Sequence, residues 1–245
     1  MRCVYLCAVF GDRDPSVTAE EHALTVVTKH LNAIQASKET RVAECVFVVN
    51  TEDERLVGVT RELEPNNPHP AWIERIQIVF RRNHGYSYGA WKAVIDLEEI
   101  QRDFDVAFLI EDDYVPSTPQ FLDIFLTKMT PRTGFVAQVA EHVACMAPHH
   151  AAVSNGLLSL AAIRHCKATC GTTLVIYPHH LDRSGYLVGT ENQITFLAGV
   201  ESCGFTVDDI ADVASVPFFD TSTNSVYERG KADAVAPLSP WQFDQ

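Results

Sequence analysis

Three adjacent carboxylates, Glu111, Asp112 and Asp113, follow an apolar run at residues 106–110. Neighbouring acids repel one another, so a folded chain must keep them solvated, protonate them or neutralise them with a cation. Carboxylate oxygens are the ligands that Mg²⁺ and other hard divalent cations prefer. The cluster therefore predicts a metal site. The simpler alternative is a solvated acidic turn before the next helix.

The elements that must position these acids alternate along the first half of the chain. Apolar runs at residues 3–10, 45–49, 76–80 and 106–110 predict strands. Thr18 and Glu21 form a capping box that predicts the start of a helix after the first strand. The apolar residues expected to face inward from that helix are Leu24, Val27, Leu31 and Ile34. This alternation predicts an α/β fold with a mainly parallel sheet, helices on both faces and ligands at the carboxyl ends of the strands.

Two further helices are predicted around the fourth strand. The first is outlined by Trp91, Val94, Ile95 and Ile100. The second should be capped by Thr118 and have Pro119 at its first position. Its expected inward residues are Phe121, Leu122, Phe125 and Leu126.

The second half is less regular. Strands are predicted at residues 135–139 and 174–177, and a surface loop rich in Pro and Asn at residues 64–70. Thr190 and Gln193 form a second capping box, which makes Glu191 the first residue of a late helix that ends near Gly204. The apolar stripe of this helix is Ile194, Leu197 and Val200. Residues 217–245 are predicted to be an extended tail or lid.

Composition narrows the class of protein. The 245 residues are 47% hydrophobic and 21% charged, which fits one fully folded globular domain. A net charge of −13 argues against nucleic acid as a partner, because phosphate backbones are bound by clustered Lys and Arg. No run approaches the roughly 20 apolar residues of a transmembrane segment. We therefore expect a soluble, cytoplasmic protein that could still dock on a membrane surface.

Seven scattered cysteines favour reduced thiols in a cytosol-like compartment. His165, Cys166 and Cys170 form a small cluster, but zinc sites usually contain a second Cys-x-x-Cys pair. The cluster is more typical of buried small residues than of a metal site.

The apolar strand followed by Glu111-Asp112-Asp113 resembles the DxD-type motif of GT-A glycosyltransferases. The resemblance implies that Mn²⁺ or Mg²⁺ grips the diphosphate of a nucleotide sugar and that Asp113 is a metal ligand. The first position of the motif is Glu instead of Asp. This leaves open whether Glu111 or Asp112 is the working partner of Asp113, and both are candidates for binding the donor.

A second stretch is similar to the Asn-x-Gly-x-x-x-Gly-Ala pattern of family-2-like GT-A enzymes. It contains Asn83, Gly85, Gly89 and Ala90, with Arg82 before it. In that family this stretch walls the nucleotide and sugar pocket. Glycines allow a ligand to approach the backbone closely, and Arg near a helix N-terminus favours phosphate. The alternative is an ordinary glycine-rich turn.

Two more strand ends belong to the same expected rim. Phe10 and Asp12 follow the first strand, and Asn50 and Asp53 follow the second. The resemblance implies that these positions cradle the base and the ribose. Asn50 or Asp53 could supply a hydrogen bond to the edge of the base.

An inverting transfer needs a carboxylate that takes the proton of the acceptor hydroxyl. Inverting GT-A enzymes often have this base at the start of a late helix, and Glu191 resembles that residue. The family also implies a further metal ligand from the C-terminal half, for which we expect His180, with His179 and Asp220 as alternatives. His142, His149 and His150 could line the acceptor groove.

The resemblance implies one GT-A domain over residues 1–245. Residues 1–115 would bind the nucleotide sugar, residues 116–216 would form the acceptor side and residues 217–245 the tail. The implied activity is a metal-dependent transfer of a sugar, from a UDP-sugar by the habits of the family, to a hydroxyl of a glycan, glycoprotein or glycolipid. The outcome would be inversion if Glu191 is the base.

Two other functions remain open from the sequence. Asp12 and Asp14 resemble the Asp-x-Asp signature of haloacid-dehalogenase-type phosphohydrolases, in which the first Asp is a Mg²⁺-assisted nucleophile. A catalytically silent domain that binds a nucleotide sugar or a glycan is the other alternative. A nicotinamide or S-adenosylmethionine enzyme is disfavoured, because no glycine-rich turn follows the first strand.

Overall fold

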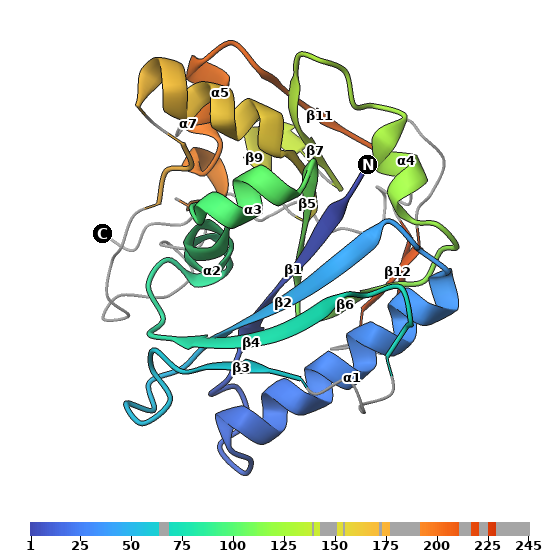
Figure 1. The fold of residues 1–245 in the computed structure, drawn as a ribbon, viewed down its shortest axis with the longest axis vertical. Helices are drawn as coiled ribbons and strands as arrows, with labels where there is room; N and C mark the ends of the chain where they lie inside the picture. The colour runs from blue at the N-terminus through green and yellow to red at the C-terminus, as the bar shows by residue number, and fades with distance from the viewer. Residues whose placement is uncertain are drawn as a thin grey trace, which may run out of the picture.

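The computed structural model describes residues 1–63, 69–138, 140–142, 151–153, 155–171, 173–176, 192–210, 217–220 and 225–228, the backbone alone for 140–142, 151–153, 217–220 and 225–228. A mixed sheet of eight strands forms the centre of the molecule (Figure 1). In spatial order its strands are β11 (Thr206–Asp209), β7 (Thr133–Ala137), β10 (Gly156–Ser159), β5 (Val106–Glu111), β1 (Cys3–Phe10), β2 (Val42–Asn50), β4 (Arg75–Arg81) and β3 (Thr60–Glu62).

Six of these strands run in one direction. Strands β5, β1, β2 and β4 pair in parallel, and β11 pairs in parallel with β7. Strand β10 is antiparallel to β5 and to β7, and β3 is antiparallel to β4. The prediction of an α/β fold with a mainly parallel sheet is therefore confirmed.

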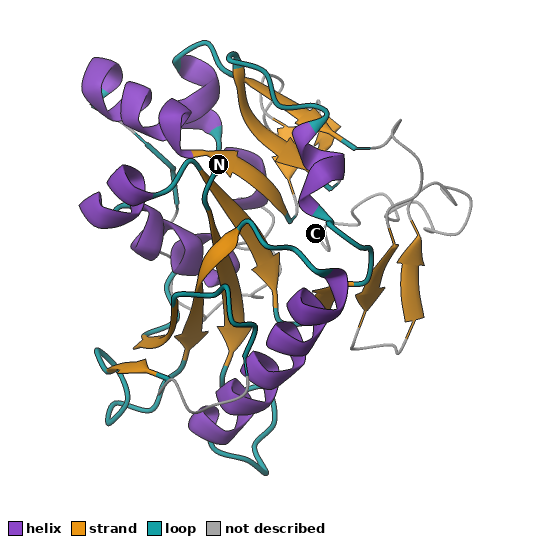
Figure 2. Ribbon diagram, turned by 45° about the vertical axis from the view of Figure 1, so that its right-hand side comes forward, coloured by secondary structure: helices purple, strands orange, loops and turns teal. Residues whose placement is uncertain are grey.

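Helices cover both faces of the sheet (Figure 2). On one face, α1 (Ala19–Ser37) and α4 (Leu122–Leu126) pack over one apolar core. On the other face, four helices pack over a second core: α2 (Tyr86–Ile95), α3 (Glu98–Asp103), α5 (Leu160–Cys170) and α7 (Ala198–Ser202). Because β1, β2 and β5 are buried between these layers, they consist of nearly continuous apolar residues.

Local signals predicted the start of α1 well. The backbone N–H of Glu21 donates to Thr18 Oγ1 at 3.2 Å, and the N–H of Thr18 donates to Glu21 Oε2 at 2.9 Å, so the capping box forms. Leu24 is 43% exposed, however, and the expectation that it faces inward was wrong. The buried stripe of α1 instead includes Ala23 and His30.

Two predictions about helix ends were also wrong. The helix expected through Trp91 and Ile100 is divided into α2 and α3, because Leu97 has an extended backbone between them. Thr118 does not cap α4. Gln120 has a left-handed φ of 48°, which is incompatible with a helix at that position, so α4 begins only at Leu122.

The second half shows further differences. Residues 173–176 form no strand, although Val175 N–H donates to the carbonyl of Phe196 at 3.0 Å. Part of the expected tail forms strands instead: β12 (Pro217–Asp220) pairs with β13 (Ser225–Glu228) and with β6 (Tyr114–Pro116), antiparallel in both cases. Strands β8 (Ala140–His142) and β9 (Ala151–Val153) form a small separate sheet. Gly204 has a φ of 86°, as expected just after a helix.

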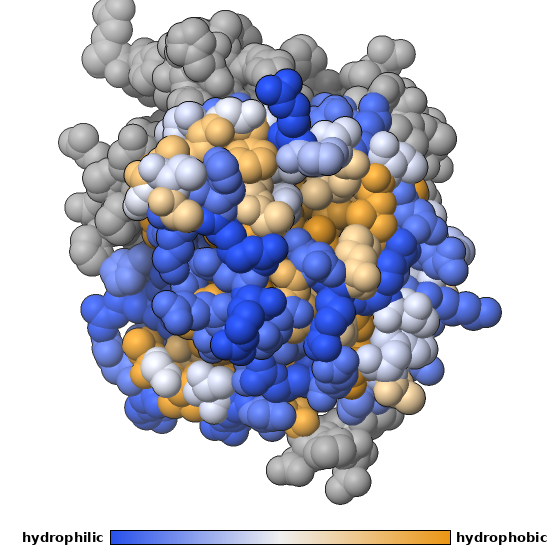
Figure 3. Space-filling view, turned by 45° about the horizontal axis from the view of Figure 1, so that its top comes forward, coloured by the Kyte–Doolittle hydropathy of each residue, from blue (hydrophilic) through white to orange (hydrophobic). Residues whose placement is uncertain are grey.

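The surface is mixed. In the face that Figure 3 shows, polar residues form a broad band and apolar residues lie in separate patches beside it. Across the described part of the chain, no helix combines the length and the apolar character that spanning a membrane requires.

Candidate functional site

The acid cluster lies where the order of the strands changes direction. From β1 the chain builds β2 and then β4 on one side, and it then crosses by α2 and α3 to β5 on the other side of β1. The crevice at the carboxyl ends of two such strands is the usual ligand site of an open α/β sheet. Strand β1 ends at Phe10 and is followed by residues 11–13, and β5 ends at Glu111 and is followed by Asp112 and Asp113, so both segments flank this crevice.

Asp112 is the most buried of the three acids, at 2% exposure. Its Oδ2 accepts the backbone N–H of Phe10 at 3.1 Å and lies 3.6 Å from His22 Nε2. Burial alone would raise its pKa, but the nearby imidazole of His22 and the charge of Arg13 hold the pKa of Asp112 below its usual value. Asp112 is therefore an ionised anchor that ties the end of β1 to the end of β5.

Arg13 neutralises part of the cluster. Its guanidinium forms an ion pair with Asp113 and lies 3.4 Å from Asp112 Oδ1. The group also lies over the ring of Phe10, 5.7 Å from its centroid. Lys29 adds a second positive charge by donating to the carbonyl oxygen of Asp112 at 2.9 Å.

Glu111 is partly buried beside these charges. Its carboxylate accepts a hydrogen bond from Ser87 Oγ, and its backbone N–H donates to Asn155 Oδ1 at 3.2 Å. Burial raises the pKa of Glu111 against the opposing effect of Ser87, and the charges of Asp112 and Asp113 raise it further. The ionised form is thus less stabilised in Glu111 than in Asp112.

These residues fit a hard divalent cation. The donor set is made of carboxylate oxygens, and the raised pKa of Glu111 shows that more positive charge would be favourable there. Glu111 and Asp113 are the two residues that would hold it, because Asp112 is turned toward the end of β1. Among the described residues no three His, Cys, Asp or Glu side chains form a metal-binding group.

Asp12 and Asn50 support the loops of the crevice. Asp12 accepts hydrogen bonds from Thr51 Oγ1 at 2.9 Å and from the backbone N–H of Glu52 at 2.7 Å. Asn50 Oδ1 accepts from Arg81 at 2.8 Å, and its amide donates to the carbonyl of Tyr86 at 3.3 Å. These contacts join the ends of β1 and β2 to the start of α2.

Asp53 and Arg82 lie farther out. Asp53 pairs with Arg55, at 2.7 Å from Asp53 Oδ2 to Arg55 Nη2, and Arg82 pairs with Glu54. Both are surface ion pairs of small energetic value, so a ligand could displace them at little cost.

The glycine-rich stretch forms the first turn of α2. Gly85 has a left-handed φ of 76°, and a Cβ on Gly89 would lie 1.8 Å from the carbonyl oxygen of His84. The side-chain oxygen of Asn83 is buried and accepts no hydrogen bond from the described residues. The turn directs Ser87 toward Glu111, so the N-terminus of α2 faces the acid cluster.

Several predicted residues lie outside the described part of the chain. They are Glu191, His179, His180, His149 and His150; for His142 and Asp220 only the backbone is described. Asn192, which follows Glu191, is buried, and its Nδ2 lies 3.5 Å from the carbonyl oxygen of Gly85. This segment therefore reaches the glycine-rich turn.

The sequence did not predict which side chains contact the acids, namely Arg13, His22, Lys29, Ser87 and Asn155. Of these, only Ser87 carried a usable signal, because it lies inside the glycine-rich pattern. Arg13 and Asn155 lie in loops, and His22 and Lys29 lie on α1. Their contacts with the acids depend on how α1 and β10 pack against β5, which residue spacing does not show.

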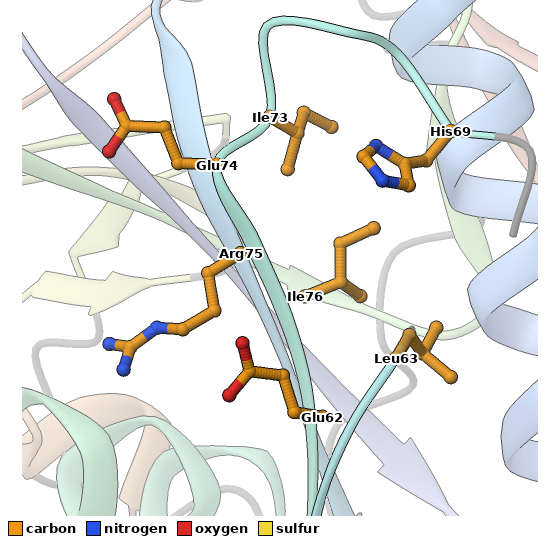
Figure 4. Close-up of a pocket in the computed structure, with 7 residues that line it drawn as sticks. All are labelled: Glu62, Leu63, His69, Ile73, Glu74, Arg75 and Ile76. Atoms are coloured by element: carbon orange, nitrogen blue, oxygen red, sulfur yellow. The ribbon is translucent and has the colours of Figure 1, made fainter. Parts of the chain in front are cut away.

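A cavity of about 500 Å³ lies at the other end of the sheet, near the beginning of β4 (Figure 4). Its lining includes Glu62, His69 and Arg75. Leu63 and His69 flank residues 64–68, which lie outside the described residues. The cavity is remote from the carboxyl ends of the strands and is not part of the candidate site.

Comparisons with known proteins do not identify a function for the chain. No family model matches the chain, and no curated protein matches it. Among solved structures, it is similar to HddC from Yersinia pseudotuberculosis with 14% sequence identity and a TM-score of 0.40. That match covers 75% of this chain and 85% of HddC.

Proposed function

We propose that the chain is a metal-dependent glycosyltransferase with a single GT-A domain, which transfers a sugar from a nucleotide diphosphate to a hydroxyl of a glycan or glycoconjugate. One observation carries the proposal: the three acids lie at the crevice between β1 and β5, where Ser87 in the first turn of α2 donates a hydrogen bond to Glu111. Surplus carboxylates beside a helix N-terminus suit a ligand that brings both a cation and phosphates.

Each residue has a distinct part in this proposal. Asp113 and Glu111, together with His180, would hold Mn²⁺ or Mg²⁺, and the cation would supply positive charge to the leaving diphosphate. Asp112 keeps the two strand ends together. Arg13, once released from Asp113, is free to pair with phosphate.

The remaining residues serve the nucleotide and the acceptor. Asp53 contacts the base and ribose. Asn50, Phe10 and Asp12 shape the loops beneath them. The diphosphate and sugar side is lined by Arg82, Asn83 and Gly89. Glu191 takes the proton of the acceptor hydroxyl as the anomeric carbon is attacked, which inverts the configuration.

The phosphohydrolase alternative is less well supported. A nucleophilic Asp12 would need a carboxylate oxygen directed at the substrate, whereas both oxygens of Asp12 accept hydrogen bonds from residues that follow β2. A silent nucleotide-sugar-binding domain shares the same donor site. It differs only in showing no turnover.

The first test is a thermal-shift panel of UDP-, GDP-, dTDP- and CMP-sugars, each with and without Mn²⁺. A ligand that binds the native state alone raises the melting temperature. We expect one nucleotide sugar, a UDP-sugar first, to raise it only when the metal is present. A failure of every donor would contradict the proposal, and release of phosphate from phosphomonoesters would then favour the phosphohydrolase.

Two variants separate donor binding from transfer. Asp113→Ala should abolish the metal-dependent shift, whereas Asp208→Ala on the exposed edge strand β11 should retain it. Glu191→Gln should keep the shift and lose transfer to an acceptor. Unchanged turnover in Glu191→Gln would remove that residue from the proposed role.

A further inference from the structure

Two helices on the face opposite α1 bring three cysteines together. Cys166 and Cys170 belong to the last turns of α5, and Cys203 ends α7. The sulfur atoms of Cys170 and Cys203 lie 2.7 Å apart although the residues are 33 positions apart in sequence. The sequence grouped His165 with Cys166 and Cys170 and favoured buried small residues, which holds for Cys166 but not for the exposed Cys170. The ring of His165 packs against Phe205, with 5.5 Å between centroids.

The pair is both close and accessible. A disulfide has a sulfur–sulfur distance of about 2.0 Å, so a shift of less than about 1 Å would join Cys170 to Cys203. Cys170 is exposed and Cys203 partly exposed, whereas Cys3, Cys7, Cys45 and Cys166 are buried. A dissolved oxidant would therefore reach this pair before the other cysteines that the structure describes.

We propose that Cys170 and Cys203 form a reversible disulfide that links α5 to α7 when the chain meets a small-molecule disulfide such as oxidised glutathione. The site is independent of the acid cluster, so its test does not depend on the proposed transferase activity. The two thiols are not part of the candidate site.

The chemistry balances in two exchange steps. The Cys203 thiolate attacks one sulfur of oxidised glutathione, which forms a mixed disulfide and releases one glutathione thiolate. The Cys170 thiolate then attacks the Cys203 sulfur and releases the second glutathione. The protein loses two protons and two electrons, and one oxidised glutathione becomes two reduced molecules.

Neighbouring groups favour Cys203 as the first nucleophile. The hydrogen bond from Cys170 lowers the pKa of Cys203, and Cys166, Ser202 and Thr169 add to this effect. Cys170 is then held in place as the resolving thiol, with its sulfur 3.4 Å from Thr169 Oγ1.

The link would fasten a segment that reaches the candidate site. Phe196, two residues before α7, packs edge-on against Tyr88 of α2 with 5.1 Å between centroids. Its ring also lies 6.1 Å from that of Trp91. A disulfide between α5 and α7 would therefore restrain the C-terminal end of the segment from Asn192 to Cys203.

Peptide mapping after tryptic cleavage tests the proposal directly. The full reduced chain is incubated with oxidised glutathione, alkylated and digested, and the peptides are identified by mass spectrometry. Cleavage after Arg164, Lys167 and Arg183 puts the three cysteines on different peptides. We expect residues 168–183 joined to residues 184–229, with a mass about 2 Da below the sum of the two thiol forms. Reduction should separate them.

Three variants complete the test. Cys170→Ser and Cys203→Ser should each abolish the joined peptides, whereas Cys145→Ser, which removes a cysteine outside the described residues, should leave them unchanged. A melt of each reduced variant shows whether it is folded. Two results would overturn the proposal. One is a disulfide to the peptide of residues 165–167, which contains Cys166, and the other is a stable glutathione adduct without any joined peptide.

Discussion

Glu111 and Asp112 are adjacent carboxylates, yet their surroundings move their pKa values in opposite directions. Burial raises the pKa of Glu111, and only Ser87 and Arg13 oppose it. Asp112 is buried too, but His22, Arg13 and the N–H of Phe10 keep its pKa low. The sequence predicted the cluster, because the three acids are contiguous. It could not divide their roles, since the contacts of Asp112 come from the loop after β1 and from α1.

Replacing Glu111 with Gln should stabilise the protein at neutral pH. A raised folded-state pKa means that Glu111 contributes to stability below its unfolded pKa and that this contribution is lost as the pH rises through the folded pKa. Gln resembles the protonated acid and removes the penalty. We expect a higher melting temperature than that of the parent chain at pH 7, and no gain near pH 4.

Asp112→Asn is the matched control for this change. The lowered pKa of Asp112 contributes stability above its unfolded value, so the amide should lower the melting temperature at pH 7. Glu111→Gln should also lose the metal-dependent response to the nucleotide sugar. A melting temperature that falls in both variants would contradict the division of roles between the two acids.

At the scale of elements, the sequence predicted helix boundaries that depend on residue type and missed those that depend on the backbone conformation of an ordinary residue. The capping box of α1 depends on Thr18 and Glu21 alone, so the sequence was sufficient. The division between α2 and α3 depends on Leu97, an apolar and half-exposed residue whose extended backbone has no signature in its residue type. The same holds for the left-handed Gln120 before α4.

Position 89 in α2 is a glycine for a packing reason. The resemblance to transferases assigned it to the donor pocket, while the fold requires a glycine there because His84 O would lie 1.8 Å from a Cβ. Gly89→Ala should therefore displace the first turn of α2 and lower the free energy of unfolding by about 1–3 kcal/mol.

Chemical denaturation of Gly89→Ala and of Ala93→Gly compares two opposite changes in the same helix. Ala93 is exposed, so its replacement costs only the helix propensity of Gly, about 1 kcal/mol. If Gly89→Ala is as stable as the parent chain, the close approach to His84 does not constrain this position.

For the whole molecule, the alternation of strands and helices predicted the four parallel strands β5, β1, β2 and β4 but not the strands that pair around them. Strands β5, β1, β2 and β4 are long or strongly apolar, and their order follows from right-handed crossovers on opposite faces. Strand β10 inserts antiparallel between β5 and β7, and β12 pairs with β6 more than 100 residues earlier in the chain. Such pairings depend on long-range packing, which residue spacing does not encode.

The core also contains a titratable group that couples the stability of the whole molecule to pH. His30 of α1 is fully buried, its Nδ1 lies 2.8 Å from the Tyr5 hydroxyl of β1, and its ring packs edge-on against Phe47 of β2. Burial lowers the pKa of His30 to about 3. In the unfolded chain an ordinary histidine binds its proton near pH 6.5.

Between those two values the unfolded state carries one more proton than the native state, so stability falls as the pH falls below about 6.5. We expect His30 to add a slope of up to about 1.4 kcal/mol per pH unit to the free energy of unfolding. Urea denaturation between pH 7.5 and 5 measures it. His30→Leu should be less stable at pH 7.5 but should have a smaller slope. His165→Gln, at an exposed position of α5, is the control for the loss of a histidine outside the core. An unchanged slope in His30→Leu would refute the role of His30.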